Sequence, residues 1–274
     1  MTMVAPLQAE IGGSTRLFAI IGHPIAQVKS PQTFNPRIAA AGLDAVLVPI
    51  HVVPEKFDDT VRGLKAIANL DGIVITVPYK ARILPFIDQV LPMAEAVGAA
   101  NAMRREPDGR WSGDMFDGVG LMRGLREQGE DPRGRRVMLL GAGGAGSAVA
   151  VALAQAGAAA VTIHDVDAVK TQAVVDRVKR AYPACDARAG APDLDSHDTL
   201  INATPTGMAE GDPLPVSIER LRPEMLVVDI IMKPEVTAFL SAARQRGCKA
   251  LPGKTMLEGQ GVELMKFFHV EGRP

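Results

Sequence analysis

Short apolar runs rich in valine and isoleucine alternate with longer segments of helical periodicity along most of the chain. Each run is apolar on both faces, which is typical of parallel strands that helices cover on both sides. The helical segments between the runs, such as 54–70 and 145–157, supply those covering layers. The pattern therefore predicts an α/β protein, with strands at 16–22, 45–52, 72–78, 136–141, 159–165, 199–204 and 225–231.

Two polar stretches that contain glycine interrupt this alternation, at 106–118 and 251–261. We therefore predict a two-domain architecture with a cleft at the junction. Ligand sites favour domain boundaries and the carboxyl ends of parallel strands. We assign residues 1–116 to an N-terminal α/β domain that binds substrate, completed by a C-terminal helix at 253–274, and residues 117–252 to a Rossmann-type dinucleotide-binding domain.

Glycines at G-x-G-x-x-G spacing follow the run at 136–141, at the point where a strand meets a helix. In this context Gly141 permits a tight turn, Gly143 lets a pyrophosphate approach the backbone, and Gly146 allows close helix packing. Unpaired amides at the start of the helix would hold the phosphates. We predict a dinucleotide site that also includes Gly144 and Ala145; the alternative is a turn that only packs.

Asp165 ends the next predicted strand, about 20 residues beyond the glycines, where an acidic residue binds the adenosine ribose. Its carboxylate would accept hydrogen bonds from the ribose hydroxyls and repel a 2′-phosphate, so we predict NAD rather than NADP. Lys170 is the only nearby cation. Two alternatives stay open: Asp165 caps a turn or the next helix, or Asp167 takes the ribose role.

Composition narrows the classes of function. The 274 residues carry a net charge of −1, so no charge field favours nucleic acid or an anionic membrane, and we expect a small-molecule partner. Cys185 and Cys248 lie far apart without metal-ligand spacing, which argues against a disulfide framework and a metal site. The start lacks a targeting signal, and no stretch reaches the ~20 apolar residues that span a bilayer, so we expect a cytoplasmic protein.

Lys80 follows the strand at 72–78, and Asp117 lies at the predicted domain crossing. A nicotinamide cofactor exchanges hydride with a carbon that bears oxygen, so a side chain must move the hydroxyl proton. Lys80 and Asp117 are the candidates for this proton transfer. On position alone, a solvated lysine and a turn-capping or helix-capping aspartate are the commoner roles.

The chain resembles the shikimate and quinate dehydrogenase family from about Phe18 to Phe268. The motifs that carry the resemblance are GHPIAQVKSP, ITVPYK, VGAANAM, GDMFDGVGL, GAGGAG, INATPTGM, DIIMKPEVTAFL and GKTMLEGQG. The resemblance implies reversible oxidation of a secondary alcohol on a six-membered carbocyclic acid. Shikimate and 3-dehydroshikimate are the expected pair, or a close relative such as quinate.

The resemblance also implies roles for individual residues. Lys80 and Asp117 would flank the reacting hydroxyl. Lys80 would stabilise the developing alkoxide, and Asp117 would orient the Lys80 side chain. Ser30 matches a serine that holds the substrate carboxylate. Contacts to the ring hydroxyls or carbonyl are implied for Thr76, Asn101 and Gln260, and the lining of the nicotinamide groove for Asn202, Ala203, Thr204 and Pro205.

Five positions depart from the family pattern by carrying apolar residues where polar ones are expected. Val28 and Met232 fall where the family holds the substrate carboxylate. A hydrogen bond to a charged group contributes about 1.5–3 kcal/mol, so losing two such partners would weaken binding roughly tens-fold to thousands-fold without compensation. The other three departures are Val74, Met115 and Phe116.

These departures leave the substrate open between two cases. In one, the pocket prefers quinate, an amino or deoxy analogue of shikimate, or a less polar hydroxy acid. In the other, Lys29, Gln27 or backbone amides replace the lost donors, and shikimate remains the substrate.

Two alternative functions remain. The chain could be an NAD-binding regulator with weak turnover, or a methylenetetrahydrofolate-type dehydrogenase of related two-domain plan. Separately, the chain could form a homodimer. Among other conspicuous residues, Tyr79 is expected to support the strand end and Trp111 to pack internally, and of the histidines only His23 is expected near the cleft.

Overall fold

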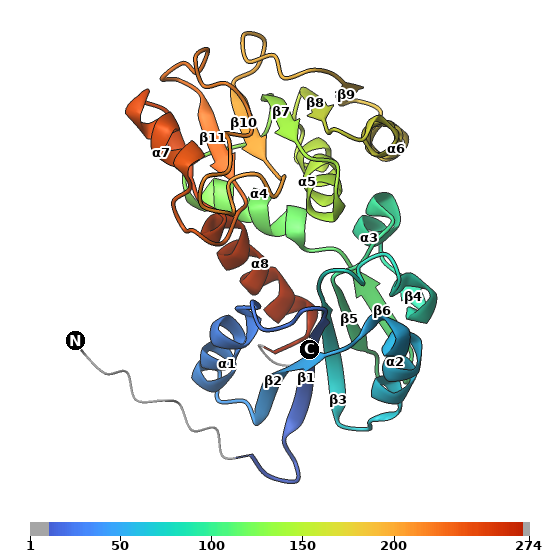
Figure 1. The fold of residues 1–274 in the computed structure, drawn as a ribbon. Coiled ribbons are helices and arrows are strands. Elements are labelled where there is room, and N and C mark those ends of the chain that lie inside the picture. Colours follow the sequence, from blue (N-terminus) through green and yellow to red (C-terminus); the bar gives the residue numbers. More distant parts are fainter. Residues whose placement is uncertain (1–10, 271–274) are drawn as a thin grey trace, which may run out of the picture. The chain divides into compact units, whose positions relative to one another are not determined.

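The computed structural model describes residues 11–270, so residues 1–10 of the predicted first domain and 271–274 of the predicted C-terminal helix lie outside it. The chain divides into two compact units (Figure 1). One comprises Met1–Met115 with Gly261–Pro274, and the other comprises Phe116–Gln260. The division at the carboxyl end falls inside the last helix, α8 (Lys254–Phe267). The binding roles that we assign to the two domains stay predictions.

The first unit is built on a six-stranded sheet with the order β2-β1-β3-β5-β6-β4. The three strands β2, β1 and β3 pair in parallel, as their apolar runs predict. Helices and short 3₁₀ turns connect the strands. The strands are β1 (Arg16–Gly22), β2 (Ala45–His51), β3 (Leu70–Ile75), β4 (Gln89–Val90), β5 (Ala102–Arg105) and β6 (Trp111–Asp114); the helices are α1 (Ser30–Ala40), α2 (Phe57–Ala66) and α3 (Pro92–Val97), with turns at Pro54–Lys56 and Leu84–Phe86.

Strands β5 and β6, which the sequence did not predict, add antiparallel pairing to this sheet, because β5 pairs antiparallel with both β3 and β6. The polar stretch at 106–118 contains strand β6, which forms a hairpin with β5, as well as the connection between the units. Strand β5 was not recognised in the sequence because two of its four residues are arginines. The Arg105 guanidinium donates to the carbonyl of Leu70 at 3.1 Å and lies 4.7 Å over the ring of Trp111, which is buried as expected.

The second unit contains six parallel strands in the order β12-β11-β10-β7-β8-β9. This order confirms the predicted Rossmann-type α/β fold, in which two halves wind outward from a switch point between β7 and β10. The strands are β7 (Arg136–Leu140), β8 (Ala160–His164), β9 (Asp186–Ala189), β10 (Thr199–Asn202), β11 (Leu226–Asp229) and β12 (Lys249–Leu251); the helices are α4 (Asp117–Glu127), α5 (Gly144–Gln155), α6 (Ala168–Ala181) and α7 (Ala238–Gln245).

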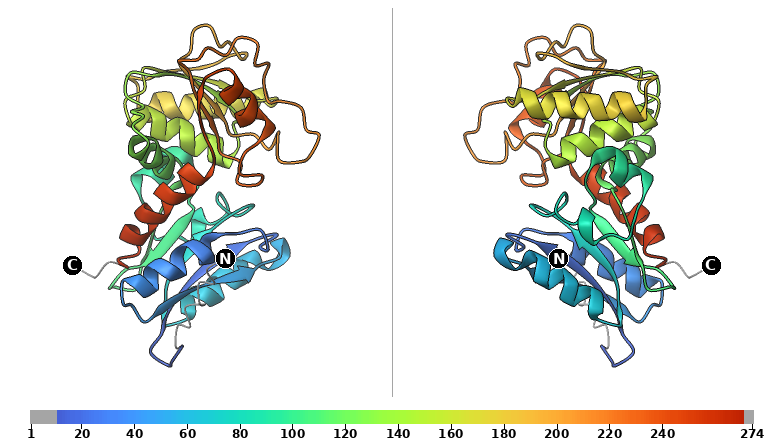
Figure 2. Two further views of the ribbon diagram at one scale, coloured as in Figure 1. Left: turned by 90° about the vertical axis from the view of Figure 1, so that its left-hand side faces the viewer. Right: turned by 90° about the vertical axis from the view of Figure 1, so that its right-hand side faces the viewer.

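Helices cover both faces of this sheet. Right-handed crossovers that run in opposite directions from β7 place α5 and α6 on one face and α7 on the other. Helices α5 and α6 lie side by side in both views of Figure 2. The core beneath α7 is fully apolar and joins Met138 and Leu140 of β7 to Phe239 and Leu240 of the helix. The switch point is therefore held between two rigid layers.

Candidate active site

In the first unit, three predicted site residues meet at the carboxyl end of β3. The Thr76 amide donates to the carbonyl of Ile21 at 3.0 Å, and the Ala100 amide donates to the carbonyl of Lys80 at 2.8 Å. Asn101 follows directly, is 1% exposed, and its carbonyl accepts from the Ile75 amide at 2.8 Å. Backbone hydrogen bonds thus hold Lys80, Thr76 and Asn101 together, although they come from separate segments.

Tyr79 fixes the backbone immediately before Lys80. The ring is fully buried and stacks on Phe57, with 4.3 Å between ring centroids, and its hydroxyl donates to the carbonyl of Val52. Burial raises the pKa of the Tyr79 hydroxyl, which keeps it a neutral donor. The supporting role expected for Tyr79 is what the structure shows, and the strand end is a rigid mount for the lysine.

Two histidines occupy the carboxyl ends of the neighbouring strands. His23 follows β1 and His51 ends β2, and their ring nitrogens Nδ1 and Nε2 lie 2.9 Å apart. A hydrogen bond at this distance requires one imidazole to be a neutral acceptor. The sequence placed His23 near the site but missed His51, since only the parallel register of β1 and β2 reveals the pair.

Ser30, the predicted contact for the substrate carboxylate, is the first residue of helix α1 in the same unit.

In the second unit, Asp117 is the first residue of α4 and is 3% exposed. The Gln260 amide Nε2 donates to its Oδ1 at 2.6 Å, so two predicted site residues meet. The amino end of a helix favours a carboxylate because the unpaired backbone amides there carry partial positive charge. Lys80 and Asp117 belong to different units, so their pairing stays a prediction.

A close approach of two helices brings Gln260 to Asp117. A Cβ added at Gly120 of α4 would lie 2.5 Å from the backbone nitrogen of Gln260, a distance that real Cβ atoms do not reach. One turn further, a Cβ at Gly124 would lie 2.2 Å from the carbonyl oxygen of Thr255. Glycines one turn apart on α4 therefore let α8 pack backbone against backbone.

The glycine-rich turn has the geometry of a phosphate cradle. Gly141 has φ +100°, in the left-handed region that favours glycine, and a Cβ there would lie 2.7 Å from the carbonyl of Ala203. Gly143 and Gly144 are exposed with open space around them, and α5 begins at Gly144, followed by Ala145. Unpaired amides at this helix start fit a dinucleotide pyrophosphate. Gly146 packs against Gly141 behind the turn.

Asp165 is tied to this turn. Its Oδ2 accepts from the Ala142 amide at 2.7 Å, and its Oδ1 accepts from the Asp167 amide at 2.9 Å. A carboxylate offers about four acceptor positions, so two remain for ribose hydroxyls. Asp167 caps α6 instead, because its carboxylate accepts from the amides of Val169 and Lys170, and these bonds lower its pKa.

The predicted nicotinamide segment leaves the carboxyl end of β10 and lies against the same turn. Asn202 is fully buried and its side chain is engaged within the protein, so it acts through the shape of the loop. Ala203 and Thr204 are half-buried and Pro205 is exposed. The Ala203 amide donates to the carbonyl of Leu140 at 2.7 Å. The loop and the glycine-rich turn therefore form one continuous surface at the switch point.

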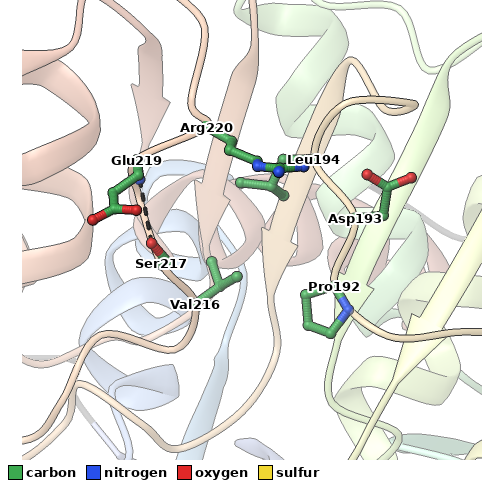
Figure 3. A pocket seen from close by; sticks show the side chains of 7 residues that line it. All are labelled: Pro192, Asp193, Leu194, Val216, Ser217, Glu219 and Arg220. Carbon is green, nitrogen blue, oxygen red and sulfur yellow. Dashed lines mark hydrogen bonds between the residues drawn. The ribbon is translucent and has the colours of Figure 1, made fainter.

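The second unit also contains an open cavity of about 390 Å³ (Figure 3). It is lined by Asp193 and Leu194 on one side and by Val216, Ser217 and Arg220 on the other, and contains no predicted site residue. Over residues 11–270 no three side chains of the metal-binding types cluster closely enough to hold a metal ion. Within that same range no helix has the length and apolar character to cross a membrane.

Known proteins resemble this chain along nearly its whole length. The model of the shikimate dehydrogenase substrate binding domain matches residues 20–103. The shikimate dehydrogenase (NADP(+)) of Rubrobacter xylanophilus is 39% identical over 266 residues, covering 93% of this chain and 91% of its own.

Two solved structures have the same fold. The shikimate 5-dehydrogenase of Listeria monocytogenes, in complex with shikimate and NAD, has a TM-score of 0.86 at 33% identity, covering 95% of this chain and 93% of its own. The ligand-free 5-ketofructose reductase of a Gluconobacter strain has a TM-score of 0.86 at 32% identity, covering 94% of each chain.

Proposed function

The chain belongs to the shikimate dehydrogenase family of NAD(P)-dependent oxidoreductases, and from this premise we propose that it interconverts the secondary alcohol of a cyclic hydroxy acid and the corresponding ketone. Shikimate and 3-dehydroshikimate are the first pair to expect. The observation that carries the proposal is the cluster of Lys80, Thr76 and Asn101 at the carboxyl end of β3, inside the region matched by the substrate-binding model.

The first unit would bind the substrate and the second the dinucleotide. The backbone amides of Gly143, Gly144 and Ala145 at the start of α5 would hold the pyrophosphate, and the loop from Ala203 to Pro205 would lie along the nicotinamide. When bound, the nicotinamide supplies the acceptor or donor of hydride.

Lys80 and Asp117 would move the proton. When the alcohol is oxidised, the lysine amine would accept the hydroxyl proton as the nicotinamide takes up the hydride, and in reduction the lysine would return the proton. Asp117 and Gln260 enter as one bonded unit, joined by the 2.6 Å hydrogen bond, and Asp117 would orient the lysine. Ser30 would contact the substrate carboxylate.

We propose NAD as the preferred cofactor, although the Rubrobacter relative is named for NADP(+). Support comes from the negative charges at this strand end. Asp165 already lies beside the glycine-rich turn through its bond to Ala142, and Asp167 lies two residues on. A 2′-phosphate placed there would face two carboxylates, whereas ribose hydroxyls would find acceptors.

A second candidate substrate class is a neutral ketose. The apolar residues Val28 and Met232 at expected carboxylate contacts favour it, as does the likeness to a 5-ketofructose reductase. Initial rates with shikimate, quinate and 5-ketofructose, each with both cofactors, separate the two classes. NAD binding without turnover of any of the three would favour the regulator instead.

Val28→Ser is expected to raise kcat/KM for shikimate by roughly tenfold, because a restored hydroxyl adds one hydrogen bond to a charged group. Val28→Thr, which restores the hydroxyl while keeping the branched shape, serves as the matched variant. The measurement is steady-state kinetics of both variants with shikimate and 5-ketofructose. Unchanged kinetics with shikimate would show that its carboxylate is held elsewhere.

A further inference from the structure

Asp229 is a fully buried carboxylate at the end of β11, and nothing in the proposed chemistry uses it. Its Oδ1 accepts from the Asn202 amide Nδ2 at 3.1 Å and from the Ile231 backbone amide at 3.2 Å. Its Oδ2 accepts from the Thr237 hydroxyl at 2.7 Å. The parallel register pairs Asn202 with Asp229, so the two side chains meet at the carboxyl ends of adjacent strands.

Asn202 also forms hydrogen bonds with the loop that follows β10. Its Oδ1 accepts from both the amide and the hydroxyl of Thr204, at 3.0 and 2.7 Å, and its Nδ2 also donates to the carbonyl of Thr206 at 3.2 Å. The Oδ1 of Asp229 is an acceptor, since it also takes the Ile231 amide, so the Nδ2 of Asn202 turns toward it. The amide oxygen is thereby left to hold Thr204.

The loop held in this way lies directly against the glycine-rich turn. A Cβ added at Gly141 would lie 2.7 Å from the carbonyl of Ala203 and 3.0 Å from the Thr204 nitrogen. The loop therefore leaves no room for a side chain at Gly141 and lies at the edge of the surface where the dinucleotide is expected to bind.

Stability alone does not account well for a carboxylate in this place. Burial raises the pKa of Asp229, because the charged form is costly without water, and its hydrogen bonds offset this only in part. An apolar side chain could fill the same space at lower cost. Unlike an apolar side chain, a carboxylate accepts a hydrogen bond from the Asn202 Nδ2 and so fixes the orientation of the Asn202 side-chain amide.

We propose that Asp229 is a positioning residue, which holds the Ala203–Pro205 loop, through Asn202, in the conformation that binds the nicotinamide end of the cofactor. This inference rests on the proposed function, which places the nicotinamide at this loop. Asp229 does not touch the cofactor. Its removal should therefore act on the nicotinamide end and spare the adenosine end, which the glycine-rich turn and Asp165 bind.

The test compares NADH with ADP-ribose, which keeps the adenosine and pyrophosphate but lacks the nicotinamide. Calorimetric titration of Asp229→Ala is expected to show NADH binding weakened about tenfold, with ADP-ribose binding unchanged. Asp229→Asn is isosteric and keeps an oxygen for the Asn202 amide and the Ile231 amide, so it should restore most of the NADH affinity. If Asp229→Ala does not fold, Thr204→Val at the half-buried end of the network takes its place.

Leu240→Ala is the matched control, because Leu240 is fully buried in the apolar core beneath α7 and its side chain has no hydrogen-bonding group. It should lower the melting temperature and leave the ratio of NADH to ADP-ribose affinity as in the natural protein. The inference is overturned if Asp229→Ala keeps that ratio, or if Leu240→Ala reduces it equally. A natural protein that binds NADH no more tightly than ADP-ribose would instead refute the placement of the nicotinamide in the proposed function.

Discussion

Lys80→Ala is expected to lower kcat with shikimate by about 10²–10⁴-fold, while the affinity for NAD stays nearly unchanged. The neutral amine is the proposed acceptor of the hydroxyl proton, and the ammonium that forms would stabilise the developing alkoxide. Tyr79 and the Ala100 backbone hold the mount independently of the lysine side chain, so the fold should survive the change. Steady-state kinetics and a separate NADH titration measure the two effects.

Lys80→Arg is the control that separates charge from proton transfer. Arginine keeps the positive charge but does not release its proton at neutral pH. We expect it to recover little of the lost kcat, because charge alone cannot accept the hydroxyl proton. Full activity of Lys80→Ala would remove the proposed proton transfer, and full recovery in Lys80→Arg would reduce the role of the lysine to electrostatics.

Asp165→Ala is expected to weaken NAD binding by roughly 10–100-fold and to relax discrimination against NADP. The substitution removes charged acceptors for the ribose hydroxyls, each worth about 1.5–3 kcal/mol, together with the charge that would repel a 2′-phosphate. It also frees the Ala142 amide of the glycine-rich turn, which adds to the loss for both cofactors. The ratio of kcat/KM for NAD to that for NADP is the quantity to measure.

Asp165→Asn divides the effect into its two parts, since the amide keeps one oxygen for the Ala142 amide while it loses the charge and the hydrogen bond from the Asp167 amide. Discrimination against NADP should fall in this variant while the turn keeps its hydrogen bond. The same change at Asp167, whose carboxylate caps α6, should shift the ratio of the two cofactors less than the change at Asp165. An unaltered ratio in Asp165→Ala would mean that another residue reads the ribose.

Most of the fold could be predicted from the sequence because seven strands are dense apolar runs, and short runs of this kind between helical segments are typical of strands buried on both faces. The strands that escaped prediction lack this signal. Strand β9 (Asp186–Ala189) has one buried residue, and β12 (Lys249–Leu251) is three residues long. Strand β5 carries Arg104 and Arg105, whose contacts appear only when the chain has folded.

The site was predictable only in part, for a similar reason. The glycine-rich turn is local, so its spacing could be read directly from the chain. The bond between Asn202 and Asp229 joins residues 27 positions apart, and the bond between Asp117 and Gln260 joins residues 143 positions apart. Such pairs depend on strand register and helix packing. Resemblance to a family supplied the expectation for Asp117 and Gln260. Asp229 opens the motif DIIMKPEVTAFL, but nothing in the sequence indicated its role.

The central claim is that Lys80 and Asp117 act as one proton-transfer unit, and a double-mutant cycle tests it most directly. The measurement is kcat/KM with shikimate and NAD for Lys80→Ala, Asp117→Ala and the double variant. When two residues act as a unit, removing either one already abolishes their joint contribution to kcat/KM. The double variant should therefore be hardly slower than Lys80→Ala alone. Losses that multiply, with the double variant slower by the product of the two single effects, would contradict the account.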